Sequence, residues 1–89
     1  MKRTLVQALL ILDYVMNHDC AFEQIGVYAK VNGVLFGDYT YASSFKGKCG
    51  EYFQKDAKEQ LYAIGKDTDI FVNITTDLNG KRRITFLPY

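Results

Sequence analysis

Between residues 4 and 17, hydrophobic positions recur at spacings of three and four, the period of a helix with one apolar face. The recurring positions are Leu5, Ala8, Leu9, Leu12, Val15 and Met16. Thr4 is a good N-cap residue, so the pattern predicts a helix that runs to about Asn17. Leu10, Ile11 and Tyr14 widen the apolar stripe beyond one narrow face, so we expect this helix to be central to the core or part of an oligomer interface.

From Phe22 to Val31 the period changes to two, which predicts a strand. Asn32-Gly33 follows it and is typical of a two-residue type I′ hairpin turn. The expected register pairs Val31 with Val34, Ala29 with Phe36, and Val27 with Asp38. The opposite face of this hairpin is expected to carry Tyr28, Lys30, Leu35, Tyr39 and Tyr41.

A second helix is predicted from the spacing of Phe53, Ala57, Leu61 and Ile64, with Gly65 as its C′ residue. A second hairpin follows. Asp77-Leu78-Asn79-Gly80 fits a type I turn with a bulge at the glycine, so that Asp77 opposes Lys81. This register places Ile70, Val72 and Ile74 on one face with Ile84 and Phe86. Pro88 suggests that the last strand is an edge strand or an incomplete one.

The expected order is helix, hairpin, helix, hairpin (αββαββ), an α+β fold in a single domain of residues 1–89. The simplest packing is a two-layer sandwich, with both helices on one face of a four-stranded antiparallel sheet.

The chain contains eleven Lys and Arg and ten Asp and Glu, which gives a net charge of +1. We therefore expect no overall electrostatic field of the kind that attracts nucleic acid or membranes. Met1-Lys2-Arg3 and the apolar run after them superficially resemble a signal peptide, but Gln7 and Asp13 interrupt the pattern and the run is too short to span a bilayer. We therefore expect a cytoplasmic protein with no membrane contact and with Cys20 and Cys49 reduced.

Candidate chemistry is sparse. His18, Cys20 and Cys49 are zinc-type donors, but they lack the paired spacings and the fourth ligand of structural zinc sites. The 46–50 segment, Lys-Gly-Lys-Cys-Gly, could attract an anion, yet it lacks the first glycine and the hydroxyl of a P-loop. No nucleophile, base and orienting group are placed together. We expect no catalytic residue, cofactor or metal, and no enzyme activity.

The outer face of the sheet is the candidate working surface, because aromatic rings beside basic side chains can bind a protein partner or stack on single-stranded nucleic acid. The expected partner-binding residues are Tyr28, Lys30, Tyr39, Tyr41, Phe71, Lys81 and Arg83. The structural alternative is that these rings pack across strands. A homodimer through the first helix is a further expectation.

These observations favour a non-enzymatic protein-binding module, because nucleic-acid binding draws most of its affinity from phosphate neutralisation and this chain is nearly neutral. Its small size and lack of motifs are similar in style to anti-CRISPR proteins, which suggests a phage or mobile-element inhibitor of a host protein complex. The alternative is a small RNA-binding or single-stranded-DNA-binding domain that uses the same aromatic and basic face.

Overall fold

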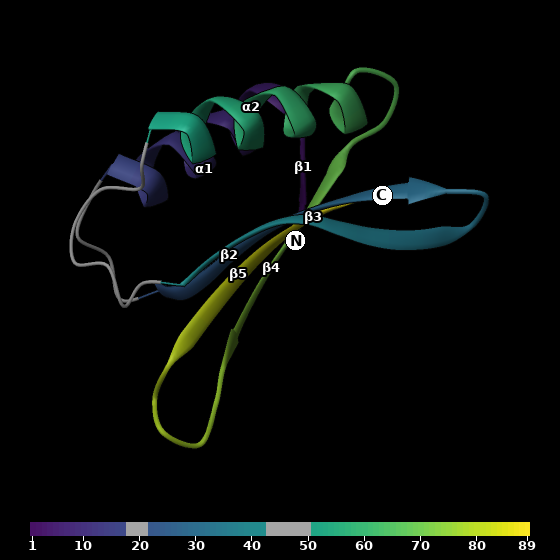
Figure 1. The fold of residues 1–89 in the computed structure, drawn as a ribbon. Coiled ribbons are helices and arrows are strands. Elements are labelled where there is room, and N and C mark those ends of the chain that lie inside the picture. The colour runs from purple at the N-terminus through teal and green to yellow at the C-terminus, as the bar shows by residue number, and fades with distance from the viewer. Residues whose placement is uncertain (18–21, 43–50) are drawn as a thin grey trace.

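The computed structural model describes residues 1–17, 22–42 and 51–89, without the side chains at 23, 35–42 and 51–53. The elements are β1 (Lys2–Arg3), α1 (Leu5–Asn17), β2 (Phe22–Val31), β3 (Val34–Ala42), α2 (Glu51–Gly65), β4 (Ile70–Thr76) and β5 (Arg82–Pro88). The strands form one sheet in the order β1-β4-β5-β2-β3, in which β1 is only two residues long. The helices α1 and α2 lie side by side over the same face of this sheet (Figure 1).

Thr4 caps α1 as predicted. Its hydroxyl accepts a hydrogen bond from the Gln7 N–H at 3.3 Å, and the Gln7 side-chain oxygen accepts one from the Thr4 N–H at 3.1 Å. This reciprocal pair is a capping box, which satisfies two backbone donors that the helix itself leaves unpaired. The predicted start of the helix is therefore confirmed.

Both predicted turns are confirmed by their backbone conformations. Asn32 and Gly33 have φ values of 51° and 80°, as a type I′ turn requires. In the second hairpin, the Gly80 N–H donates to the Asp77 carbonyl at 3.1 Å and the Asp77 N–H to the Lys81 carbonyl at 2.9 Å. Gly80 has a φ of 78°, so the type I turn with a glycine bulge is present.

The predicted register of the first hairpin is wrong from Val27 onward, because β3 contains a bulge. Val31 pairs with Val34, Ala29 with Phe36 and Tyr28 with Gly37, as the expected register requires. Val27 pairs with Tyr39 rather than Asp38, which leaves Asp38 outside the ladder. Val27 is fully buried, so the predicted pair would have placed a carboxylate in a buried row. The bulge removes that conflict.

The prediction of an all-antiparallel sheet is also wrong, because β2 and β5 are parallel. The pairs Ile25 with Ile84 and Val27 with Phe86 place two apolar strands next to each other in the interior of the sheet. All four side chains are at most 2% exposed. Burial of both strands favours this arrangement over one in which either is an edge.

Pro88 does not mark an edge strand, since β5 lies between β4 and β2. The Tyr89 N–H donates to the Asp69 carbonyl at 2.9 Å, whereas Val72 directs its N–H to the Met1 carbonyl, away from β5. Along an antiparallel pair, the residues of every second pair direct their N–H groups away from each other, as Val72 and its partner do. The same holds two residues further on, where Pro88 pairs with Ile70, so an N–H at residue 88 would point toward β2. The parallel pairing ends at Phe86, before the position at which residue 88 would have to donate to β2.

The core lies between the helices and one face of the sheet. It contains Ala8, Leu12, Val15, Met16, Phe22, Ile25, Val27, Ala57, Leu61, Ile70, Val72, Ile84 and Phe86. Gly65 is the last residue of α2 rather than a residue beyond it, and a Cβ there would lie 2.7 Å from Leu5 Cδ1. A side chain at this position would therefore displace the side chains of Leu5 and Ile70 that pack against the end of α2.

Candidate functional site: the outer face of the sheet

The sheet face opposite the helices carries mostly polar side chains. Strand pairing aligns them in two rows across β4, β5 and β2. One row is Thr75, Arg83 and Gln24, and the other is Asn73, Thr85 and Gly26. Neither α1 nor α2 lies over this face (Figure 1). Amides, hydroxyls and one guanidinium are thus presented together on a rigid, hydrogen-bonded scaffold.

A shallow hollow of about 240 Å³ lies over these rows and is lined by Gln24, Gly26, Tyr28, Asn73, Thr75, Arg83 and Thr85. Gly26 is buried, and a Cβ built on it would lie 2.7 Å from Cε2 of Tyr28. The absence of a side chain at residue 26 therefore lets the Tyr28 ring lie against the strand. The ring forms the apolar part of a hollow whose other lining side chains are polar.

The three consecutive basic residues 81–83 take different positions. The Arg82 guanidinium lies 4.7 Å from the centre of the Phe22 ring, a cation–π contact, and Phe22 belongs to the core. Lys81 is at the turn, where its N–H donates to the Asp77 carboxylate at 2.9 Å. Of the three, only Arg83 lines the hollow.

The structure brings together Tyr28 and Arg83 among the predicted binding residues. Phe71 is half-buried and pairs with Leu87, beyond the end of the hollow. Lys30 is exposed, two residues along β2 from Tyr28.

Strand pairing sets Tyr39 opposite Val27 and Tyr41 opposite Ile25, two β2 residues that are buried on the helix side. The register on which their expected place is based is wrong from Val27 onward, and their side chains lie outside the described part of the chain, so their role in binding stays a prediction. Residues 26 and 24 pair instead with Thr40 and Ala42.

Sequence reasoning missed Gln24, Gly26, Asn73, Thr75 and Thr85 as members of this surface. Each follows the period-two pattern of its own strand, so their outward positions could have been found. Their meeting depends on the parallel contact between β2 and β5, which joins residues about 60 positions apart and has no local signal.

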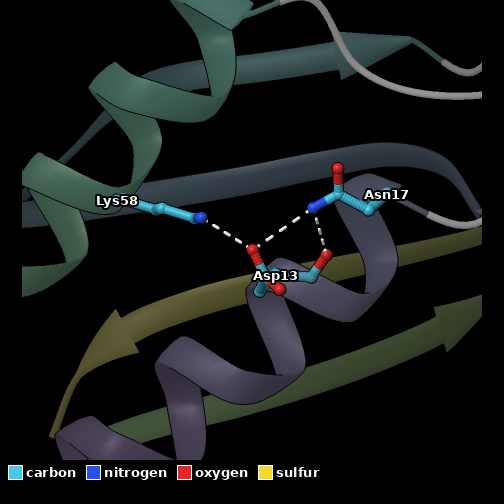
Figure 2. A network of polar contacts seen from close by, with 3 residues as sticks. All are labelled: Asp13, Asn17 and Lys58. Atoms are coloured by element: carbon cyan, nitrogen blue, oxygen red, sulfur yellow. Dashed lines mark hydrogen bonds and ion pairs between the residues drawn. The ribbon is translucent and has the colours of Figure 1, made fainter.

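The helix side carries a second depression, of about 440 Å³, lined by Val6, Leu9, Leu10, Asp13 and Lys58. The Lys58 ammonium lies 2.6 Å from the Asp13 carboxylate, which also accepts a hydrogen bond from the Asn17 amide at 3.2 Å (Figure 2). The same amide donates to the Asp13 carbonyl at 2.9 Å. This polar contact joins the two helices, and the rest of the lining is apolar.

No cluster of three or more potential metal ligands occurs among the residues that the structure describes. His18, Cys20, Cys49 and the segment 46–50 lie outside those residues, so their expected lack of a metal or anion site stays a prediction. No helix in the described ranges has the length and apolar character needed to cross a membrane. Comparison with protein-family models, curated proteins and solved structures finds no match.

Proposed function

We propose that the protein is a non-enzymatic binding module that recognises a protein partner through the hollow on the outer face of its sheet. The observation that carries this proposal is the meeting of Tyr28 and Arg83 in one hollow, on a face that neither helix covers. Tyr and Arg are the residue types in which interface binding energy is concentrated.

The surrounding side chains support a protein partner. Gln24, Asn73, Thr75 and Thr85 supply uncharged donors and acceptors, which can pair with a partner's backbone and side chains. The hollow would accept a projecting side chain of the partner, with the Tyr28 ring against its apolar part and the polar groups around its end. An interface of this kind is an apolar centre within a polar rim.

Charge disfavours nucleic acid. A strand of nucleic acid would need several cations along its path, but Arg83 is the only cation among the described residues that line the hollow. Lys2, on the strand next to β4, already has partners within the chain, since its ammonium lies 3.6 Å from the Asp69 carboxylate and 4.3 Å from the centre of the Tyr89 ring.

The inhibitor role suggested by the size of the chain is a narrower form of this proposal, and the identity of the partner decides it.

Photo-crosslinking tests the proposal directly. A photoreactive amino acid at position 73, which is exposed and lines the hollow, is compared with the same amino acid at position 59, which is exposed on α2. Irradiation in cells that express the protein should attach a discrete protein to position 73 and not to position 59.

Arg83→Ala, combined with the reactive group at position 73, should reduce the yield of that adduct. Recovery of nucleic acid at position 73, or of the same protein equally from both positions, would contradict the proposal.

A further inference from the structure

Helix α1 exposes large apolar side chains on the side away from the sheet. Val6, Leu10 and Tyr14 are 67%, 67% and 59% exposed, and their spacing of four places them in one stripe, which we call the α1 stripe. A solvent-facing helix surface normally carries polar residues here. The stripe presents on the order of 300 Å² of apolar surface, which is within the range of the largest apolar patch on a typical monomer, and such patches are often functional.

The depression between the helices lies beside this stripe, since Val6 and Leu10 belong to both. The surface therefore combines projecting apolar side chains with a hollow of about 440 Å³ on the same helix face. A projection next to a hollow is the shape that can complement its own copy across a twofold axis, where each side chain meets the other protomer's hollow.

The charges on α1 limit which kinds of partner could bind to the α1 stripe. Asp13 is the only charged residue of α1, and Lys58 of the same chain already neutralises it at 2.6 Å. The surface thus carries no net charge that would repel a second copy. Nor does α1 supply the basic residues that would attract an anionic membrane or nucleic acid.

We propose that two copies of the chain form a symmetric dimer through the α1 stripe and the depression beside it. A standard interface buries about 800 Å² per partner. The stripe would form its apolar centre, and the surrounding polar residues of α1 and α2 its rim.

This dimer would leave the outer sheet faces of both protomers accessible, because both helices lie on one side of the sheet (Figure 1). The residues that line the hollow alternate along their strands with the buried residues of the helix side. The assembly would then present two copies of the hollow, and a partner with repeated sites would be held more tightly than by one copy.

Sedimentation velocity over protein concentrations from about 1 μM to 1 mM tests the proposal, a range that covers weak and moderate dimers. The parent should shift from the 10.2 kDa monomer to twice that mass as concentration rises. Leu10→Glu should stay monomeric or raise the dimer dissociation constant by at least about tenfold, since a charge would enter the apolar centre. Leu78→Glu is the matched control, because Leu78 is fully exposed at the β4–β5 turn and should leave dimerisation unchanged.

Val6→Glu and the uncharged Leu10→Gln repeat the test, with circular dichroism to establish that each variant is folded. A parent that remains monomeric up to 1 mM would overturn the dimer, and so would folded Leu10→Glu and Val6→Glu proteins that dimerise as the parent does. Monomeric Leu10→Glu should keep the parent's affinity per protomer for the partner of the sheet face, which separates this proposal from the one above.

Discussion

Gly26 and Tyr28 stand two residues apart on the same face of β2, and the ring of Tyr28 occupies the space that a side chain at Gly26 would need. A Cβ at residue 26 would lie 2.7 Å from Tyr28 Cε2 and 3.2 Å from its hydroxyl oxygen. The ring is the far end of a side chain that can rotate away, so the glycine sets the position of the ring more than the stability of the strand.

Gly26→Ala should therefore change binding more than folding. The methyl group should displace the Tyr28 ring and weaken partner binding by about 1 to 2 kcal/mol, because a displaced aromatic anchor loses its contacts. The free energy of unfolding should change by less than about 1 kcal/mol, since alanine also reduces the backbone entropy lost on folding. Calorimetric titration with the partner and urea denaturation measure the two effects, and a variant that binds as the parent does would show that the position of the ring is irrelevant.

Gly80 tests the second hairpin turn. Its φ is 78°, and no atom lies within 4 Å of a Cβ built there, so any cost of substitution comes from the backbone. Gly80→Val should destabilise the fold by about 1 to 2 kcal/mol, because a β-branched residue is strained at positive φ. Gly80→Asn is the control and should cost less, since asparagine tolerates this conformation. Thermal unfolding measures both, and equal melting temperatures for parent and Gly80→Val would contradict the turn.

Phe86 tests the core. It is fully buried and pairs with Val27 on one side and Val72 on the other. Phe86→Ala should destabilise the protein by about 3 to 5 kcal/mol through lost burial and the cavity left behind. Denaturant titration should show this loss, whereas Leu87→Ala, on the half-buried opposite face, should cost less. A loss below about 1 kcal/mol for Phe86→Ala would reverse the assignment of the two faces.

The salt dependence of binding distinguishes a protein partner from a nucleic acid. Because the described lining of the hollow contains one cation, Arg83, partner affinity should fall by less than about tenfold between 50 and 200 mM salt. Nucleic acid held by several phosphate contacts would lose about 10³-fold or more over the same range. Such a loss, measured by titration at several salt concentrations, would favour the nucleic-acid alternative.

Local features of the sequence predicted local structure well. The Thr4 cap, the Asn32-Gly33 turn and the Asp77 to Gly80 turn each depend on residues within four positions of one another, and each is present. Capping and turn chemistry act over this range, so one sequence is sufficient to predict them.

The pairing between hairpins could not be predicted in this way. Nothing within either hairpin indicates that β2 lies parallel to β5, because that contact depends on how both hairpins bury their apolar faces together. The two rows of outward-facing residues at the candidate site depend on this parallel contact between β2 and β5. The bulge at Asp38 did have a signal, since the unbroken register set a carboxylate against Val27, the centre of an apolar pattern.

Partner affinity of Tyr28→Ala is the most direct measurement of the central claim, that the outer sheet face is the working surface. With the crosslinked protein purified as titrant, Tyr28→Ala should weaken binding by about 1 to 3 kcal/mol, as loss of an aromatic anchor does. Its melting temperature should remain close to the parent's. Tyr62→Ala, which removes a tyrosine 60% exposed on α2, should bind as the parent does. A folded Tyr28→Ala protein with the parent's affinity, or an equal loss from Tyr62→Ala, would contradict the claim.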